Sequence, residues 1–140
     1  QFVASPLDRT RNTMEIARLQ MELQPNEYQT DDRLIEITFG AWEKSTIEEL
    51  AAKNQFDIDR RQLNKWNFTP PDGESYAAGA KRASSFLNDL SAPSIVVTHG
   101  GIMRAVRHLI EDLSGNDAAN LSIPQDRIYH FDGKTGGWLD

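Results

Sequence analysis

The sequence predicts an α/β fold with three layers, in which helices cover a mostly parallel central sheet. Short apolar runs with strand character alternate with helical segments along the chain, and this alternation is typical of parallel sheets. Two runs, at residues 2–4 and 95–97, lead through a short turn into an amphipathic helix. A chain of 140 residues can bury one sizeable core but not two. We therefore predict a single domain over residues 1–140.

Composition and charge narrow the class of protein. The formal net charge of −6 argues against a nucleic-acid binder, which needs a basic face. The sequence has no apolar stretch long enough to span a membrane. The absence of cysteine excludes disulfides, thiolate catalysis and Cys-ligated metal sites. We expect a cytoplasmic protein whose partners include neither nucleic acid nor membrane. Whether the chain forms a homodimer is left open by the sequence.

The first strand–turn–helix unit opens the chain. The apolar run at residues 2–4 stops at Ser5 and Pro6, and serine as N-cap followed by proline predicts the start of a helix. We expect this helix to run to about Leu23. Arg9 then lies in its first turn, where a cation opposes the helix dipole by about 0.3–1 kcal/mol. From its spacing alone, a solvated arginine and a functional one are equally good interpretations.

The middle of the chain is predicted to hold one ordered loop and three helices. Residues 31–42 combine acids, a glycine and two large aromatic side chains, a mixture typical of an ordered loop. A capping box over residues 45–48 opens a helix that runs to about Asn54. A short charged helix is expected over residues 57–66. A longer amphipathic helix is expected over residues 75–90.

The second strand–turn–helix unit, residues 94–110, carries the main functional signal. Its β-branched run at residues 95–97 fits a strand buried on both faces. His99 follows at the carboxyl end of what we expect to be a central strand, where ligands bind in open α/β sheets. Gly100 lets a ligand approach the backbone, and the N–H groups of a helix start favour an anion. An imidazole beside such a helix start suggests phosphate chemistry, although a lone histidine here is as often structural.

After this helix we expect a loop over residues 114–120 and strands at residues 121–123 and 127–131. Two further histidines lie in this half of the chain. His108 falls on the polar face of the preceding helix, and His130 falls in the late strand. We interpret both as structural or surface residues.

Four segments, in order, resemble motifs of the histidine phosphatase superfamily, the phosphoglycerate mutase-like enzymes. Residues 4–13 are similar to its SPLxRxxxT segment, and residues 34–43 are similar to LxExxxGxWEG. Residues 73–75 match its GES motif, and residues 97–101 are similar to the segment around its second catalytic histidine. Each motif alone is weak, but four in the right order form a specific signal. The resemblance covers essentially the whole chain and implies a phosphoglycerate mutase-like fold.

The resemblance implies a metal-independent phosphomonoester hydrolase that works through a phosphohistidine intermediate and needs no cofactor. Arg9, His99 and the backbone N–H of Gly100 would bind the phosphoryl group, whose spread negative charge needs fixed donors. The expected ligand is a small phosphorylated substrate or inorganic phosphate. Three dispersed histidines without a His-x-x-Glu-type cluster predict no metal site. Sugar phosphates, phosphoglycerate, nucleotides and phosphoproteins all stay open as substrates.

Glu36 is the candidate general acid that the resemblance implies. It would protonate the leaving alcohol and then activate the water that hydrolyses the phosphohistidine. The other interpretation of Glu36 is a loop acid paired with Arg33 or Lys44. We interpret Glu74 and Ser75 as residues of a helix start and not as substrate contacts.

The sequence departs from the family pattern at two places. Family members begin with a strand that ends in Arg-His-Gly, whose histidine is the nucleophile; we expect this motif upstream of Gln1. Without it, we expect residues 1–140 alone to be inactive, and the strands at residues 2–4 and 95–97 to have unpaired edges. The second departure is Lys44, where the family usually has glycine.

Two other functions stay open at this point. A mutase would use the same site and return the phosphoryl group to a second substrate. A non-catalytic protein that binds a phosphorylated ligand would fit if the nucleophile is truly absent.

Overall fold

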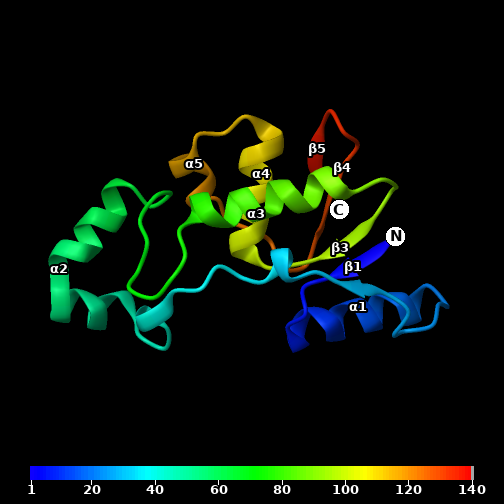
Figure 1. Ribbon diagram of the computed structural model, residues 1–140, viewed down its shortest axis with the longest axis horizontal. Helices are drawn as coiled ribbons and strands as arrows, with labels where there is room; N and C mark the ends of the chain where they lie inside the picture. The colour runs from blue at the N-terminus through cyan, green and yellow to red at the C-terminus, as the bar shows by residue number, and fades with distance from the viewer. Residues whose placement is uncertain (140) are drawn as a thin grey trace.

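The computed structural model describes residues 1–139 and shows an α/β fold with a parallel central sheet (Figure 1). The strands are short, and the helices account for most of the ordered chain. The elements in chain order are β1 (Phe2–Ala4), α1 (Asp8–Gln20), β2 (Gln29–Thr30), the 3₁₀ helices η1 (Asp32–Leu34) and η2 (Gly40–Trp42), α2 (Ile47–Leu63), α3 (Tyr76–Asp89), β3 (Ile95–Val97), α4 (Gly100–Glu111), α5 (Gly115–Ala119), β4 (Ile128–Phe131) and β5 (Gly136–Leu139).

The central strand of the sheet is β1, and the strand order is β2-β1-β3 with both pairings parallel. Val3 is in register with Gln29 on one side and with Val96 on the other. The prediction that β1 lacks a partner is therefore wrong. The prediction that β3 is a central strand buried on both faces is also wrong: in the described chain β3 lies at the edge, and Ile95 is 40% exposed. Three β-branched residues predict a strand but do not reveal how many neighbours it has.

Helices cover both faces of the sheet, as the three-layer prediction requires. Val3 points to one face, where it packs with Leu34 and with Phe86 of α3. Phe2 points to the other face, and the guanidinium of Arg18 in α1 lies 4.4 Å from the centre of its ring. Figure 1 shows α1 on one side of the strands and α3 and α4 on the other. Burying each large apolar side chain at these two interfaces contributes about 1.5–3 kcal/mol.

Helix α1 begins at Asp8, later than predicted, and Ser5 is not its N-cap. The N-cap is Leu7, whose side chain cannot accept a hydrogen bond. Thr10 instead ties the turn together, because its hydroxyl donates to the carbonyl oxygen of Ser5 at 2.9 Å and to that of Leu7 at 2.7 Å. The helix ends at Gln20, earlier than the expected end. The late start leaves the Ser5 hydroxyl, which is fully buried, available for another partner.

The helices of the middle segment follow the predicted pattern with small shifts. The capping box of α2 is made by Thr46 and Glu49, one residue later than expected. As predicted, the helical structure is interrupted at Asn54, whose φ of −156° and ψ of 87° lie outside the helical range and divide α2 into two helical parts at a kink. The prediction for α3 is confirmed: the hydroxyl of Ser75 accepts the backbone N–H of Ala78 at 3.1 Å.

The segment after α4 differs from the prediction. Residues 114–120, expected as a loop, contain α5, which Ser114 caps by accepting the N–H of Asp117 at 3.2 Å. Residues 121–123, expected as a strand, have no regular structure. The carbonyl oxygen of Leu121 accepts a hydrogen bond from Arg104 of α4 at 2.8 Å and is therefore bonded to a side chain instead of a neighbouring strand.

The chain then forms the antiparallel hairpin β4–β5, in which Tyr129 pairs with Trp138 and their ring centres lie 5.2 Å apart. The hairpin is tied to α4, because the Tyr129 hydroxyl donates to the carboxylate of Glu111. Within residues 1–139, no helix combines the length and apolar character needed to cross a membrane.

Candidate active site

The turns that follow β1 and β3 lie side by side at the carboxyl end of the sheet. The N–H of Ser5 donates to the carbonyl oxygen of Val97 at 2.9 Å, which continues the pairing of the two strands into the turns. This contact brings together the first turns of α1 and α4. As a result, Nε of Arg9 donates to Nδ1 of His99 at 3.2 Å, although the two residues are 90 positions apart.

The hydrogen bonds of His99 select one tautomer of its ring. Because Nδ1 accepts from Arg9, the proton resides on Nε2, which donates to the hydroxyl of Ser5 at 2.7 Å. The His99 side chain lies in a buried position, and its burial lowers the pKa of the imidazole. The negative charge of Glu36 raises the pKa of His99, while the positive charges of Arg9 and Arg82 lower it further. His99 is therefore neutral at pH 7 when no anion is bound.

Glu36 lies at the first turn of α4, next to the other two side chains of the site. Its Oε2 accepts the N–H of Gly101 at 3.1 Å, and its Oε1 accepts the N–H of Ile37 at 2.9 Å. A carboxylate at this place interacts favourably with the positive end of the helix dipole. A Cβ atom at Gly101 would lie 2.4 Å from Oε1 of Glu36, so this approach requires glycine. A Cβ atom at Gly100 would meet only ordinary contacts, the closest at 3.6 Å.

The ion pair between Glu36 and Arg33, considered from the sequence, is not formed. The guanidinium of Arg33 binds Asp31 at 2.7 Å and Asp89 at 2.6 Å. Glu36 is thus positioned by backbone N–H groups of two segments and not by a neighbouring cation.

The other two histidines lie away from this cluster. Nδ1 of His108 donates to the carbonyl oxygen of Leu113 at 2.7 Å, and its ring lies 4.4 Å from that of Trp66, centre to centre. His130 is an exposed residue of β4. The structure thus places His99 alone beside Arg9 and Glu36.

Sequence reasoning did not assign Ser5 or Arg82 to this site. Ser5 was interpreted as a helix cap, because serine before proline is a common helix start. Arg82 follows the GES segment by seven positions with no local pattern that marks it. Its partner Glu74 was interpreted as a residue of the helix start, yet their carboxylate and guanidinium form an ion pair of 2.8 Å. Only the folded chain brings Arg82 near enough to influence His99.

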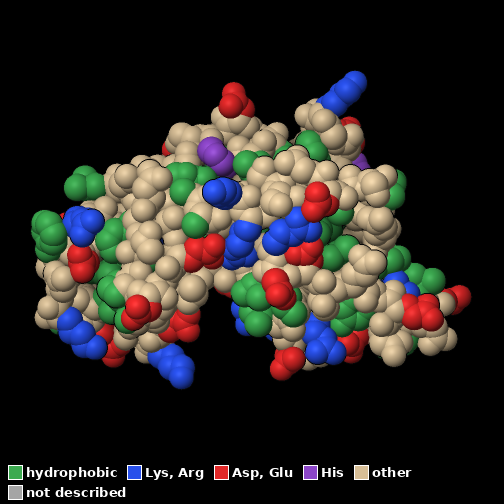
Figure 2. All heavy atoms as spheres, in the orientation of Figure 1, with side chains coloured by type: hydrophobic (Ala, Val, Ile, Leu, Met, Phe, Trp, Pro, Cys, Tyr) green, Lys and Arg blue, Asp and Glu red, His purple; other side chains and the backbone are tan. Residues whose placement is uncertain are grey.

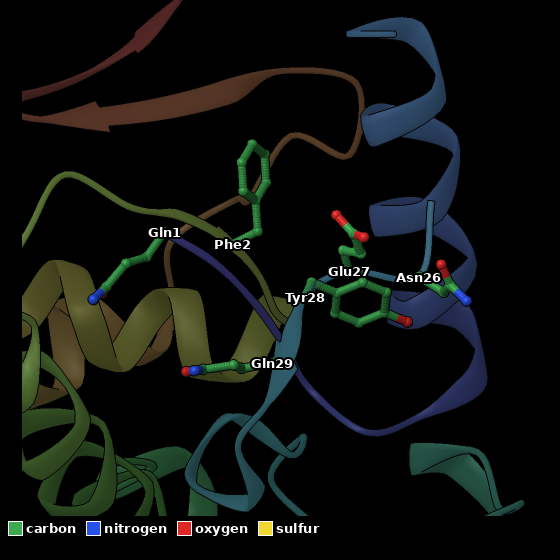
Figure 3. A pocket seen from close by; sticks show the side chains of 6 residues that line it. All are labelled: Gln1, Phe2, Asn26, Glu27, Tyr28 and Gln29. Atoms are coloured by element: carbon green, nitrogen blue, oxygen red, sulfur yellow. The ribbon is translucent and has the colours of Figure 1, made fainter. Parts of the chain in front are cut away.

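The surface of the molecule is hollowed in two places. Figure 2 shows a notch in the molecule between the part built by η2 and α2 and the part built by α1. In the same orientation, α1 begins at the edge of this notch, and β1 ends on that side (Figure 1). A second hollow, of about 410 Å³, lies at the opposite, amino-terminal end of β1 (Figure 3); it is lined by Gln1, Phe2, Asn26, Glu27, Tyr28 and Gln29.

Comparison with known proteins agrees with this geometry. Residues 1–139 match the histidine phosphatase superfamily (branch 1). This chain belongs to the histidine phosphatase superfamily. The fold places Arg9, Glu36 and His99 in one cluster.

The curated relatives are longer than this histidine phosphatase chain. Bifunctional protein Rv2228c of Mycobacterium tuberculosis (strain H37Rv) is 31% identical over 135 residues, which is 88% of this chain and 36% of that protein. The uncharacterized protein Mb2253c of Mycobacterium bovis matches with the same identity and coverage. The chain therefore spans about a third of the length of the curated relatives it matches.

Solved structures of phosphatases share the fold. The α-ribazole phosphatase of Shigella flexneri superposes with a TM-score of 0.76 at 18% identity, over 99% of this chain and 70% of that one. The mycobacterial glucosyl-3-phosphoglycerate phosphatase Rv2419c, in complex with inorganic phosphate, gives 0.73 at 22% identity, over 86% of this chain and 63% of that one. At these identities the likeness establishes the fold.

Proposed function

We propose that the protein is a metal-independent phosphomonoester hydrolase that works through a phosphohistidine intermediate. One observation carries the proposal: Arg9 and His99 meet at 3.2 Å at the starts of two helices. Glu36 is bonded to the start of the second helix, so a candidate acid lies beside a candidate phosphate site. The solved relatives named as phosphatases, one of them with bound inorganic phosphate, support this choice of substrate class.

In this proposal the phosphoryl group binds between Arg9 and the first turn of α4. The planar guanidinium can contact two phosphate oxygens at once, which a lysine cannot do. The anion raises the proton affinity of His99, so that Nδ1 becomes a charged donor while Nε2 keeps its bond to Ser5. Two fixed cations then meet the negative charge that spreads over the phosphoryl oxygens during transfer.

Glu36 serves as the acid and later as the base. Glu36 carries a proton when the phosphate ester binds. Glu36 gives this proton to the leaving oxygen as the ester P–O bond breaks and the P–N bond forms. Its carboxylate then takes a proton from the water that attacks phosphorus, and the P–N bond breaks to release phosphate.

We assign the nucleophilic histidine to a segment outside these 140 residues. Both nitrogens of His99 are used in binding: Nε2 donates to Ser5, and Nδ1 accepts from Arg9 without an anion and donates to the anion once it is protonated. His108 donates to the backbone carbonyl of Leu113, just after α4, and His130 lies on the hairpin. These 140 residues thus supply the phosphate-binding and acid–base residues of the proposed enzyme.

The test traps the intermediate on the full-length protein. The protein is mixed with a ³²P-labelled aryl phosphate in the presence of EDTA, and the reaction is stopped within the first turnover. We expect steady hydrolysis and an acid-labile, base-stable label on protein. Transfer of the label to a second alcohol instead of water would favour a mutase. Vanadate binding without label or hydrolysis would favour a non-catalytic protein that binds a phosphorylated ligand. Absence of vanadate binding would exclude the phosphate site at Arg9 and His99.

A further inference from the structure

The segment that carries Glu36 has no regular secondary structure. Residues 35–39 connect η1 to η2 without a helix or strand. A catalytic side chain must be held within a fraction of an ångström of its working position. Catalytic side chains often lie on loops that a rigid scaffold holds in place, so contacts between this segment and the rest of the fold must supply the rigidity.

Hydrogen bonds hold both ends of this segment. At its start, Nη1 of Arg82 donates to the carbonyl oxygen of Arg33 at 2.6 Å, and the hydroxyl of Thr98 donates to that of Leu34 at 2.9 Å. At its end, the backbone N–H of Glu74 donates to the carbonyl oxygen of Thr38 at 2.9 Å. The donors come from α3, from the residue before His99 and from the residues just before α3.

Arg82 and Glu74 are also bonded to each other. Nε and Nη2 of Arg82 donate to the two carboxylate oxygens of Glu74, each at 2.8 Å. Both side chains are only 21% exposed, so water competes weakly for these bonds. A single two-bond ion pair therefore connects the donor at one end of the Glu36 segment with the donor at the other.

We propose that the Arg82–Glu74 pair, called here the clamp, is a positioning device that sets the place of the Glu36 carboxylate at the start of α4. The clamp does not touch the phosphoryl group; it acts through Glu36. The inference rests on the proposed function in one respect, that Glu36 is the acid. The positive charge of Arg82 also disfavours protonation of His99, in agreement with its nearness to the site.

Arginine is required at position 82 by geometry and not by charge alone. Its guanidinium uses one edge for the Glu74 carboxylate and the remaining nitrogen for the Arg33 carbonyl. A lysine ammonium presents its three donors from a single atom and cannot reproduce this fork. Arg82→Lys thus keeps the charge and removes the clamp. Arg107→Lys is the matched control, since Arg107 makes the same two-bond contact with Glu111, at 2.7 and 2.8 Å, within α4.

The first measurement does not depend on catalysis. The Gly101 amide donates to Glu36, so its NMR resonance and its hydrogen-exchange rate report whether the carboxylate is in place. We expect Arg82→Lys to shift this resonance and to speed exchange, and Arg107→Lys to leave both unchanged. Melting temperatures of the two variants are compared to exclude general unfolding. An unchanged Gly101 amide in Arg82→Lys would overturn the clamp.

The second measurement uses leaving groups on the full-length protein. Arg82→Lys should slow hydrolysis of an alkyl phosphate by about 10- to 100-fold, the range expected for a misplaced catalytic group. An aryl phosphate, whose leaving group needs little protonation, should be slowed much less. In a Glu36→Gln background, Arg82→Lys should add almost nothing, because both changes remove the same function.

The outcomes separate the clamp from the proposed function. Equal slowing of both substrates, or a loss that adds fully to that of Glu36→Gln, would overturn the clamp as a positioning device. If Glu36→Gln itself leaves the leaving-group dependence unchanged, the acid assignment fails, and the Gly101 amide still decides whether the clamp positions the carboxylate.

Discussion

Ser5 and His99 lie 94 positions apart and share a buried hydrogen bond of 2.7 Å between the serine Oγ and the imidazole Nε2. The bond crosses from the turn after β1 to the turn after β3. It turns Nδ1 of His99 toward Arg9, which donates to it from the first turn of α1. The packing of the sheet and the orientation of the candidate phosphate-binding ring are thus connected through one hydroxyl group.

Ser5→Ala should weaken both folding and phosphate binding. Without the hydroxyl, Nε2–H of His99 is left buried without its partner, which costs about 1–3 kcal/mol of unfolding free energy. The ring also loses its fixed orientation, so the affinity for inorganic phosphate should fall. Urea unfolding and a phosphate titration check both effects. Ser91→Ala, at an exposed position before β3, is the control; equal losses in the two variants would refute the role of the bond.

Arg9→Ala should reduce the affinity for vanadate by on the order of 10- to 100-fold. The reason is that loss of a charge-assisted hydrogen bond costs about 1.5–3 kcal/mol. Isothermal titration on the intact protein measures the change. Arg11→Ala removes an exposed cation two positions further along α1 and should leave the affinity nearly unchanged. Equal affinities of Arg9→Ala and the parent protein would exclude the proposed phosphate site.

Stability should fall as the pH is lowered through about 6.5, the ordinary pKa of histidine. Burial lowers the pKa of His99 in the folded protein, so over this range the unfolded chain takes up a proton that the folded chain does not. The unfolded state is then favoured, and the loss continues until the lowered pKa of the folded state is reached. Urea unfolding between pH 7.5 and pH 5 measures the slope, and His99→Asn should reduce it.

An NMR titration of the His99 imidazole gives an independent check of the same effect. Without anion, its midpoint should lie below that of an unfolded histidine. Saturating phosphate should move the midpoint upward, because the anion stabilises the charged ring. A midpoint at or above the ordinary value in anion-free buffer would contradict the assignment.

Lys44→Gly should stabilise the protein by about 1 kcal/mol. Lys44 has a φ of 63°, in the left-handed region, which costs a residue with a side chain about 1–2 kcal/mol. Glycine removes this strain but gains entropy in the unfolded chain, which offsets part of the benefit. Thermal unfolding measures the net effect. Lys81→Gly, at an exposed position inside α3, should instead destabilise by about 1 kcal/mol, and a similar loss in Lys44→Gly would show that its backbone is not strained.

Local signals predicted the regular elements that lie between clear start and stop residues. The cap at Ser75 and the apolar stripe that follows it predicted α3 within one residue at each end. The β-branched run before His99 predicted β3. Errors appear where a side chain has a partner far away in the sequence. Ser5 was predicted to cap α1, but its hydroxyl binds His99 instead.

The sequence by itself determined the α/β class and the two strand–turn–helix units, which depend on periodicity and capping, properties of neighbouring residues. The resemblance to family motifs indicated Arg9, Glu36 and His99 as candidates. Tertiary structure alone decided that β1 is the central strand, that Glu36 accepts from Gly101 and that Arg82 pairs with Glu74 beside it. Those relationships depend on strand register and on helix packing, which bring together groups that no local pattern connects.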